Sequence, residues 1–137
     1  MKDRFKFRYV FAKDFGGKTG ICYKMPIFNL DTITDENFNK IVKSYIDYGY
    51  KLISIEQSTG LKDKNGKLIY EGDVIKVVTQ PNIIENIGIV KWDNKSAQFL
   101  RTASITDENS LVSFWWNDTT EVIGNVYEHP ELLSEVE

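Results

Sequence analysis

The hydrophobic period changes within the first half of this chain, and the change limits the folds that the chain can adopt. From Asp35 to Tyr48 the large apolar residues recur at the spacing of an amphipathic helix. This stripe consists of Phe38, Ile41, Val42, Tyr45 and Ile46. Thr34 or Asp35 can cap the start of the helix, and Gly49 suits a left-handed cap at its end. Because such a stripe must be buried, we expect the helix to pack on a sheet formed by the neighbouring segments.

Alternating patterns on both sides of the helix predict strands. Arg4 to Ala12 alternates charged and aromatic residues, and Tyr50 to Glu56 alternates again after the helix. A glycine-rich hairpin loop separates the first strand from a second one at Gly20 to Met25. Pro26 should end that strand, because proline lacks the N–H group that a ladder needs. The first 57 residues are therefore predicted to form a β-β-α-β unit.

Residues 59–137 are predicted to be almost entirely β. Six short segments, separated by turns rich in Gly, Asn and Asp, favour a compact barrel or sandwich. These strands are expected at residues 68–70, 74–79, 88–92, 97–101, 112–116 and 121–127. Asn65-Gly66 predicts a tight turn, and Pro130 predicts the start of a short terminal helix. The small polar residues Ser58-Thr59-Gly60 place the boundary between the two parts, 1–58 and 59–137.

Two segments of the second part have a distinctive wording. Thr59 to Val78 reads TGLKDKNGKLIYEGDVIKVV, and Val122 to Leu133 reads VIGNVYEHPELL. Together with KFR at Lys6 to Arg8, they resemble the signature segments of the YopX family of bacteriophage and prophage proteins. The resemblance implies a small SH3-like β-barrel of the YopX type in residues 59–137. With the β-β-α-β unit that the pattern predicts before it, the expected fold is α+β and mainly β. The family usually has a Trp close after KFR, whereas this chain has Tyr9-Val10.

Composition and targeting signals indicate where the protein acts. No window approaches the roughly 18 consecutive apolar residues that a membrane span needs. The N-terminal MKDRFKFRYV has no apolar signal-peptide core. The single cysteine, Cys22, cannot form an internal disulfide, which fits a reducing compartment. We therefore expect a protein of the bacterial cytoplasm that does not contact membrane.

The net charge of −3 hides opposite charges in the two parts. Residues 1–58 carry ten Lys and Arg against seven Asp and Glu, whereas residues 59–137 carry seven against thirteen. Any contact with phosphate would therefore be made by the first part, because an acidic surface repels nucleic acid.

Motifs that support catalysis or metal binding are weak. The only histidine, His129, has no neighbouring His or Cys with which to hold zinc. Asp63-Lys64-Asn65-Gly66 has its glycine in the wrong position for a calcium loop, and Gly16-Gly17-Lys18-Thr19 lacks the rest of a phosphate-binding loop. The acidic residues fall mainly in turns, where Asp accepts local backbone hydrogen bonds. We expect no catalytic residue, no metal, no cofactor and no enzymatic activity.

Two clusters are candidates for binding. Arg4, Lys6 and Arg8 share one face of the first predicted strand and form a possible nucleic-acid-binding row, for which we expect weak binding at most. Phe114, Trp115 and Trp116 lie on one predicted strand, so that alternation sends at least one large ring away from the core. That ring can pack against the first unit or form an interface with another molecule.

The favoured function is that of a non-enzymatic phage or prophage accessory protein that binds protein and self-associates into a homo-oligomer. One alternative is a nucleic-acid-binding accessory factor that uses the row Arg4, Lys6 and Arg8. Another is a small inhibitor of a host enzyme or defence system, with a host protein as partner and the acidic second part acting as a decoy.

Overall fold

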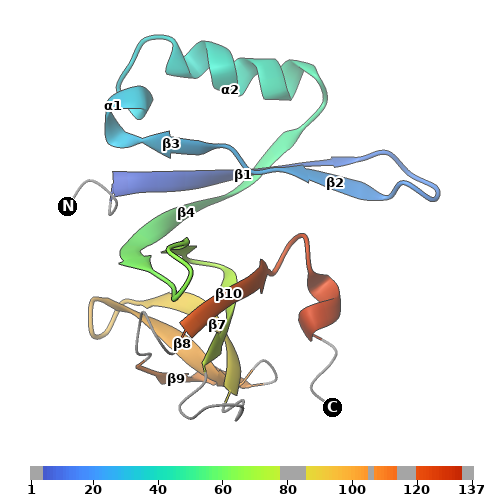
Figure 1. Ribbon diagram of the computed structural model, residues 1–137. Coiled ribbons are helices and arrows are strands. Elements are labelled where there is room, and N and C mark those ends of the chain that lie inside the picture. The colour runs from blue at the N-terminus through green and yellow to red at the C-terminus, as the bar shows by residue number, and fades with distance from the viewer. Residues whose placement is uncertain (1–4, 78–85, 105–106, 114–119, 134–137) are drawn as a thin grey trace. The chain divides into compact units, whose positions relative to one another are not determined.

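The computed structural model describes residues 5–77, 86–104, 107–113 and 120–133. The chain divides into two compact units, Met1–Ser58 (unit 1) and Thr59–Glu137 (unit 2). Strands dominate both units and the helices are few (Figure 1), as an α+β, mainly β fold requires. Within the described ranges, no helix has the length and apolar character needed to cross a membrane.

Unit 1 is a small sheet with β1 (Lys6–Asp14) at its centre. β1 pairs antiparallel with β2 (Ile21–Lys24), β3 (Ile27–Asn29) and β4 (Lys51–Lys62). Two helices, α1 (Leu30–Ile33) and α2 (Phe38–Asp47), connect β3 to β4. α2 lies over one face of this sheet (Figure 1).

The predicted β-β-α-β order did not include β3 or α1. Pro26 explains why β3 was missed. β2 pairs with Phe11 to Asp14 and β3 pairs with Lys6 to Arg8, so both lie along the same side of β1. Between them, the Pro26 carbonyl accepts a hydrogen bond from the Tyr9 N–H at 3.0 Å. Pro26 therefore separates β2 from β3, but the chain stays paired with β1 because the Pro26 carbonyl still accepts a hydrogen bond from it.

The start of α2 was predicted three residues too early. Thr34 is the C-cap of α1, and the Asp35 Oδ1 accepts the Asn37 N–H at 2.8 Å. Asp35 thus orders the turn before the helix without being its N-cap.

The end of α2 is as predicted. Gly49 has φ +92°, its N–H bonds to the Ile46 carbonyl, and the Tyr50 N–H bonds to the Tyr45 carbonyl. This pair of hydrogen bonds is a Schellman motif. The rings of Tyr45 and Tyr50 pack edge to face at 6.2 Å and add the apolar contact that usually accompanies the motif.

The core of unit 1 lies between α2 and the sheet. Phe38, Val42 and Tyr45 pack against the buried residues Tyr9, Phe11 and Phe28. The other two members of the predicted stripe are exposed, Ile41 by 37% and Ile46 by 53%. These two flank the central line of the stripe, and a narrow sheet contacts only that line.

Unit 2 contains an antiparallel sheet in the order β10-β6-β7-β8-β9. Its members are β6 (Asp73–Val77), β7 (Asn86–Asp93), β8 (Gln98–Ser104), β9 (Asp107–Val112) and β10 (Thr120–Asn125). The short β5 (Leu68–Tyr70) pairs with β4, and the predicted terminal helix is the 3-10 helix η2 (Pro130–Leu133). Buried apolar clusters lie on both faces of the sheet, one around Ile75 and Val90 and one around Val74 and Ile89.

Strands β7 and β8 of this sheet approach each other closely at Gly88. A Cβ atom at Gly88 would lie 2.3 Å from the Thr102 carbonyl oxygen, so only glycine fits there. The Thr102 hydroxyl accepts the Ile89 N–H at 3.0 Å, and the pairing of β8 with β9 is irregular directly after Thr102. Irregular pairing of this kind increases twist and lets the sheet curl.

The boundary between the units falls inside a strand and not in a loop. β4 runs from Lys51 to Lys62, and Ser58 and Thr59 at the boundary are both buried. The Thr59 hydroxyl donates to the Ile69 carbonyl of β5 at 2.9 Å. The polar residues at the boundary are therefore ladder residues of a continuous strand.

Candidate functional site

Asp63 connects, through its hydrogen bonds, the two segments that resemble the YopX family. Its Oδ1 accepts the N–H groups of Asn65 and Lys67, both at 2.9 Å, and closes the turn at Asn65-Gly66. Its Oδ2 accepts the N–H of Val122 in β10, also at 2.9 Å. Asp63 is 4% exposed, so its carboxylate depends on these three backbone donors for its hydrogen bonds.

The same hydrogen bonds decide the protonation of Asp63. Burial by itself would raise its pKa. The backbone N–H groups of Val122, Lys67 and Asn65, helped by the charge of Lys67, outweigh burial and hold the pKa of Asp63 below its usual value. The carboxylate therefore stays ionised and acts as an acceptor within the fold.

Charged side chains surround this turn at the surface. Glu121 forms ion pairs with Lys64 and Lys76, each at 3.4 Å, and the Lys64 N–H donates to the Thr120 carbonyl at 2.9 Å. Partly exposed pairs of this kind contribute little to stability. They hold the hairpin 63–67 beside the start of β10.

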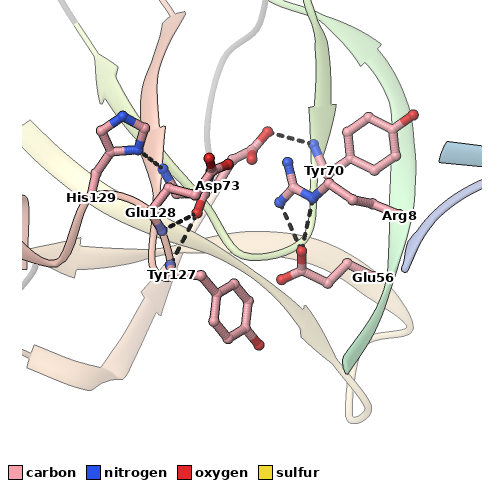
Figure 2. Close-up of polar contacts among 8 residues, drawn as sticks. Arg8, Glu56, Tyr70, Asp73, Tyr127, Glu128 and His129 are labelled. Carbon is pink, nitrogen blue, oxygen red and sulfur yellow. Dashed lines mark hydrogen bonds and ion pairs between the residues drawn. The ribbon is translucent and has the colours of Figure 1, made fainter. Parts of the chain in front are cut away.

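A second buried carboxylate orders the Glu71-Gly72-Asp73 turn. Asp73 is 1% exposed and its Oδ2 accepts the Tyr70 N–H at 2.9 Å (Figure 2). Gly72 has φ +86°, donates to the Val90 carbonyl and accepts from the Val126 N–H. The turn is thus bonded to β7 and to the residue that follows β10.

His129 caps the turn that follows β10. Its Nδ1 accepts the Asn125 N–H at 3.3 Å, and its own N–H donates to the Asn125 carbonyl at 3.1 Å (Figure 2). The Asn125 Oδ1 accepts the N–H groups of Tyr127 and Glu128 at 3.0 and 2.8 Å. The one histidine therefore has a backbone-capping role here.

Arg8 forms a buried ion pair within unit 1 (Figure 2). Its Nε donates to the Glu56 Oε1 at 2.9 Å, and its terminal nitrogen lies 2.8 Å from the same oxygen. Arg8 is 8% exposed and Glu56 is 3% exposed. The guanidinium is therefore held by a carboxylate 48 residues away in sequence.

Of the predicted site residues, the structure describes Lys6 and Arg8. Arg4 and the run Phe114, Trp115 and Trp116 lie outside the described residues. Lys6 is half-buried on β1 and Arg8 is paired with Glu56. The pairing was missed because the alternating pattern placed Arg8 on a solvent face. The only signal was Glu56 itself, an acidic residue at the end of an apolar strand pattern.

Metal-ligating side chains are dispersed over the described part of the chain. Among the described residues, no three or more His, Cys, Asp or Glu side chains lie close enough to hold a metal ion. Cys22 is a free, half-buried thiol on β2. Gly16 to Thr19 lies in the hairpin loop between β1 and β2, which the Phe15 N–H closes by bonding to the Gly20 carbonyl.

Comparison with known proteins agrees with the wording of the two joined segments. The sequence profile of the YopX family, described as YopX protein, matches residues 19–134. A protein of Bacillus subtilis (strain 168), the SPbeta prophage-derived uncharacterized protein YopX, is 29% identical, over 74% of this chain and 87% of its own length. The crystal structure of protein EF1440 from Enterococcus faecalis aligns with a TM-score of 0.45 at 21% identity, over 93% of this chain and 96% of that one. With most of its length matched by the family profile, this chain belongs to the YopX family.

Proposed function

We propose that this protein is a non-enzymatic accessory protein of phage or prophage origin that binds protein and self-associates in the bacterial cytoplasm. The phage origin is supported by the relative from Bacillus subtilis, whose description names the SPbeta prophage. The unpaired thiol of Cys22 suits a reducing compartment. The observation that carries the proposal of self-association is the distribution of exposed apolar side chains.

Exposed large hydrophobic residues gather in unit 1. Among the described residues, Trp92 is the one such side chain in unit 2. Those in unit 1 are Phe5, Phe15, Ile21, Ile27, Leu30, Ile41, Ile46, Tyr48, Leu52, Ile53 and Ile55. Exposed apolar residues that are scattered singly are normal, but contiguous ones indicate an interaction surface. The contiguous ones lie on β4.

Leu52, Ile53 and Ile55 form an apolar strip on β4, with exposures of 39%, 48% and 48%. The pairing with β1 shifts between Val10 and Phe11, which leaves Ile53 as the extra residue of a bulge. A bulge re-aims side chains, which explains how neighbouring apolar residues of one strand are exposed together.

Among the described residues, no strand pairs with the outer edge of β4 beside this strip. The hairpin 63–67 folds β5 back onto the last residues of β4, because the Asp63 N–H bonds to the Lys67 carbonyl. With three residues, β5 reaches only the part of β4 after the strip. An open strand edge with apolar side chains is a template for pairing with another chain.

The occupant we propose is a second copy of the chain. A two-fold axis brings the same strip of both copies together, so a single apolar patch is self-complementary. In an antiparallel alignment, Lys51 at the start of β4 in one copy lies near Glu56 and Gln57 of the second copy. The charge of Glu56 is already paired with Arg8. No like charges then meet across the strip.

Light scattering tests this self-association. The parent protein should have a mass at least twice the 15.8 kDa of one chain. Ile55→Lys should give the mass of one chain, because lysine on an edge strand blocks pairing. Ile46→Lys is the matched control, since Ile46 is 53% exposed on α2 and outside the strip. A parent protein that is monomeric at micromolar concentrations, or an equal effect of both variants, would refute the proposal.

The absence of enzymatic activity is part of the same proposal. It is supported by the involvement of His129 and Asp63 in backbone hydrogen bonds. With folding checked by circular dichroism, His129→Ala and Cys22→Ser should bind partners as the parent does. A folded variant that loses its biological activity, with recovery on added zinc, would reveal an active site.

We also propose that unit 2 is an SH3-like barrel. In support, β6 to β9 follow one another as neighbours, and the last strand, β10, returns to pair with β6. A five-stranded meander closes in this order. An experimental structure without the pairing of β10 and β6 would exclude it.

Nucleic-acid binding is the weaker candidate. It rests on the row Arg4, Lys6 and Arg8, and the guanidinium of Arg8 already has the Glu56 carboxylate as partner. A buried ion pair would have to be broken before Arg8 could bind phosphate. A tight, salt-sensitive affinity for single strands would reverse this ranking.

A further inference from the structure

Arg101 projects from the face of the unit 2 sheet that carries an apolar cluster. On β8 it lies opposite Val90 of β7 and Val112 of β9. Side chains directly opposite in an antiparallel ladder share a face. Val90 is fully buried and belongs to the cluster of Ile75, against which Phe99 also packs. Arg101 follows Phe99 by two residues and so lies on the same face.

The guanidinium of Arg101 is incompletely bonded. One terminal nitrogen donates to the carbonyl of the adjacent Thr102 at 3.2 Å. The Nε–H is buried and has no hydrogen-bond acceptor. The ion pairs described above are those of Arg8, Lys64 and Lys76, and none of them includes Arg101. Burial also lowers the pKa of Arg101, which reflects the cost of keeping its charge there.

Arg8 shows how this protein normally buries an arginine. Its Nε and a terminal nitrogen both reach the carboxylate of Glu56. Arg101 presents the same edge of the guanidinium without a carboxylate. An arginine keeps its charge in proteins, so a partly buried guanidinium is more stable when an anion compensates it.

Aromatic side chains lie on the same face of the sheet as Arg101. Phe99 is paired with Trp92 of β7, and their rings pack edge to face at 5.0 Å. Trp92 is 42% exposed, so its ring is accessible on the face that carries Arg101. An anionic group at Arg101 could therefore be attached to an apolar body that contacts Phe99 and Trp92.

We propose that Arg101 is the oxyanion-binding residue of a ligand site on unit 2. It would hold one carboxylate or phosphate group through its Nε–H and a terminal nitrogen, in the bidentate geometry that guanidinium favours. Residues 59–137 have seven basic against thirteen acidic side chains, so a polyanion such as nucleic acid would be repelled. The ligand is thus a compound with a single oxyanion group and an apolar part.

NMR of the arginine Nε–H groups tests the site directly. The chain has three arginines, Arg4, Arg8 and Arg101, so Arg8 is an internal control. Sodium phosphate, sodium acetate and sodium chloride are titrated at equal ionic strength. The Arg101 signal should shift saturably with phosphate or with acetate, and the Arg8 signal should not move. The anion that saturates identifies phosphate or carboxylate as the ligand group. No shift with either, or an equal shift with chloride, would overturn the proposal.

Two variants distinguish a binding role from a structural one. Arg101→Lys keeps the charge but loses the forked donor, and should weaken oxyanion binding by about tenfold or more. Arg101→Met keeps the aliphatic part and removes the uncompensated charge. It should therefore melt at a higher temperature than the parent without added anion, and it should lose the stabilisation that the anion gives the parent. If Arg101→Met melts lower or does not fold, the arginine is structural and the proposal is wrong.

Discussion

The core of unit 1 is built from aromatic rings, whereas the turns of unit 2 are closed by buried polar groups. In unit 1, Phe11 stacks on Tyr45 at 4.5 Å, and Tyr9, Phe28 and Phe38 meet edge to face at 5.1 to 5.4 Å. In unit 2, Asp63, Asp73 and Asn125 are buried and bond to backbone N–H groups. Ring packing tolerates other apolar residues of similar volume. A buried carboxylate has few substitutes, because its donors would lose their acceptor.

The difference between the two units explains why the family could be identified from the residues of unit 2. The two segments that resemble the YopX family contain Asp63, Asp73 and Asn125, together with the turn glycines Gly66 and Gly72. Each of these residues has a role that depends on its particular side chain or on a positive φ. Unit 1 depends on apolar pattern instead, and pattern identifies a fold class and not a family.

The largest effect is expected at Gly88, and Gly49 provides the comparison. Gly88→Ala should cost more than about 4 kcal/mol or prevent folding, because its Cβ would meet the Thr102 carbonyl, which is backbone. Gly49→Ala should cost only about 1 kcal/mol, since its nearest neighbour is the flexible Lys13 side chain and its positive φ is the main difficulty. Urea denaturation measures both. Similar costs for the two substitutions would mean that the Thr102 backbone can move away from residue 88.

Asp63→Ala tests the importance of buried carboxylates in unit 2. It removes the charged acceptor of three backbone N–H groups and should lower the free energy of unfolding by about 3 to 5 kcal/mol. The control is Asp93→Ala, at an exposed turn where the carboxylate accepts from Ser96. Its effect should be much smaller. A stable Asp63→Ala protein would show that these turns do not need the carboxylate.

Paired substitutions on α2 test the core of unit 1. Val42→Asp places a charge against the aromatic cluster and should cost about 2 to 4 kcal/mol. Ile41→Asp should cost less than about 1 kcal/mol, because that side chain is 37% exposed. Thermal melts of the two variants give the comparison. If Ile41→Asp is the more damaging, the orientation of α2 on the sheet is wrong.

The pH dependence of stability gives the smallest effect. Asp63 has a lower pKa in the folded protein than in the unfolded chain, so the unfolded state binds more protons in acid. Its contribution is fully present above the ordinary aspartate pKa of about 4 and is lost as the pH falls through the lowered value. Asp63→Asn should flatten this part of the stability curve. An unchanged acid limb would assign the dependence to other carboxyl groups.

Local pattern predicted the elements of the fold better than the contacts between them. The helix, its end at Gly49 and the terminal turn at Pro130 follow from short-range rules, and the structure has all three. β3 was missed because Pro26 predicted the end of the strand pairing with β1, whereas the pairing continues after Pro26. The partners of the buried charges lie 48 residues apart for Arg8 and Glu56 and 59 for Asp63 and Val122. No periodic pattern carries information over that separation.

The same limit applies to the candidate sites. The sequence marked Arg8 as a residue for an external anion and drew no attention to Arg101. Which arginine has a carboxylate partner depends on strand register, and register was not available from the pattern.

The path of β4 affects how the protein can be divided. Since one strand supplies ladder residues before and after the boundary at Ser58 and Thr59, the junction offers a protease no exposed loop to cleave. Cutting the chain there would leave each fragment with half a strand and unpaired backbone groups. Unfolding of β4 in one unit would also remove paired residues next to the boundary in the other.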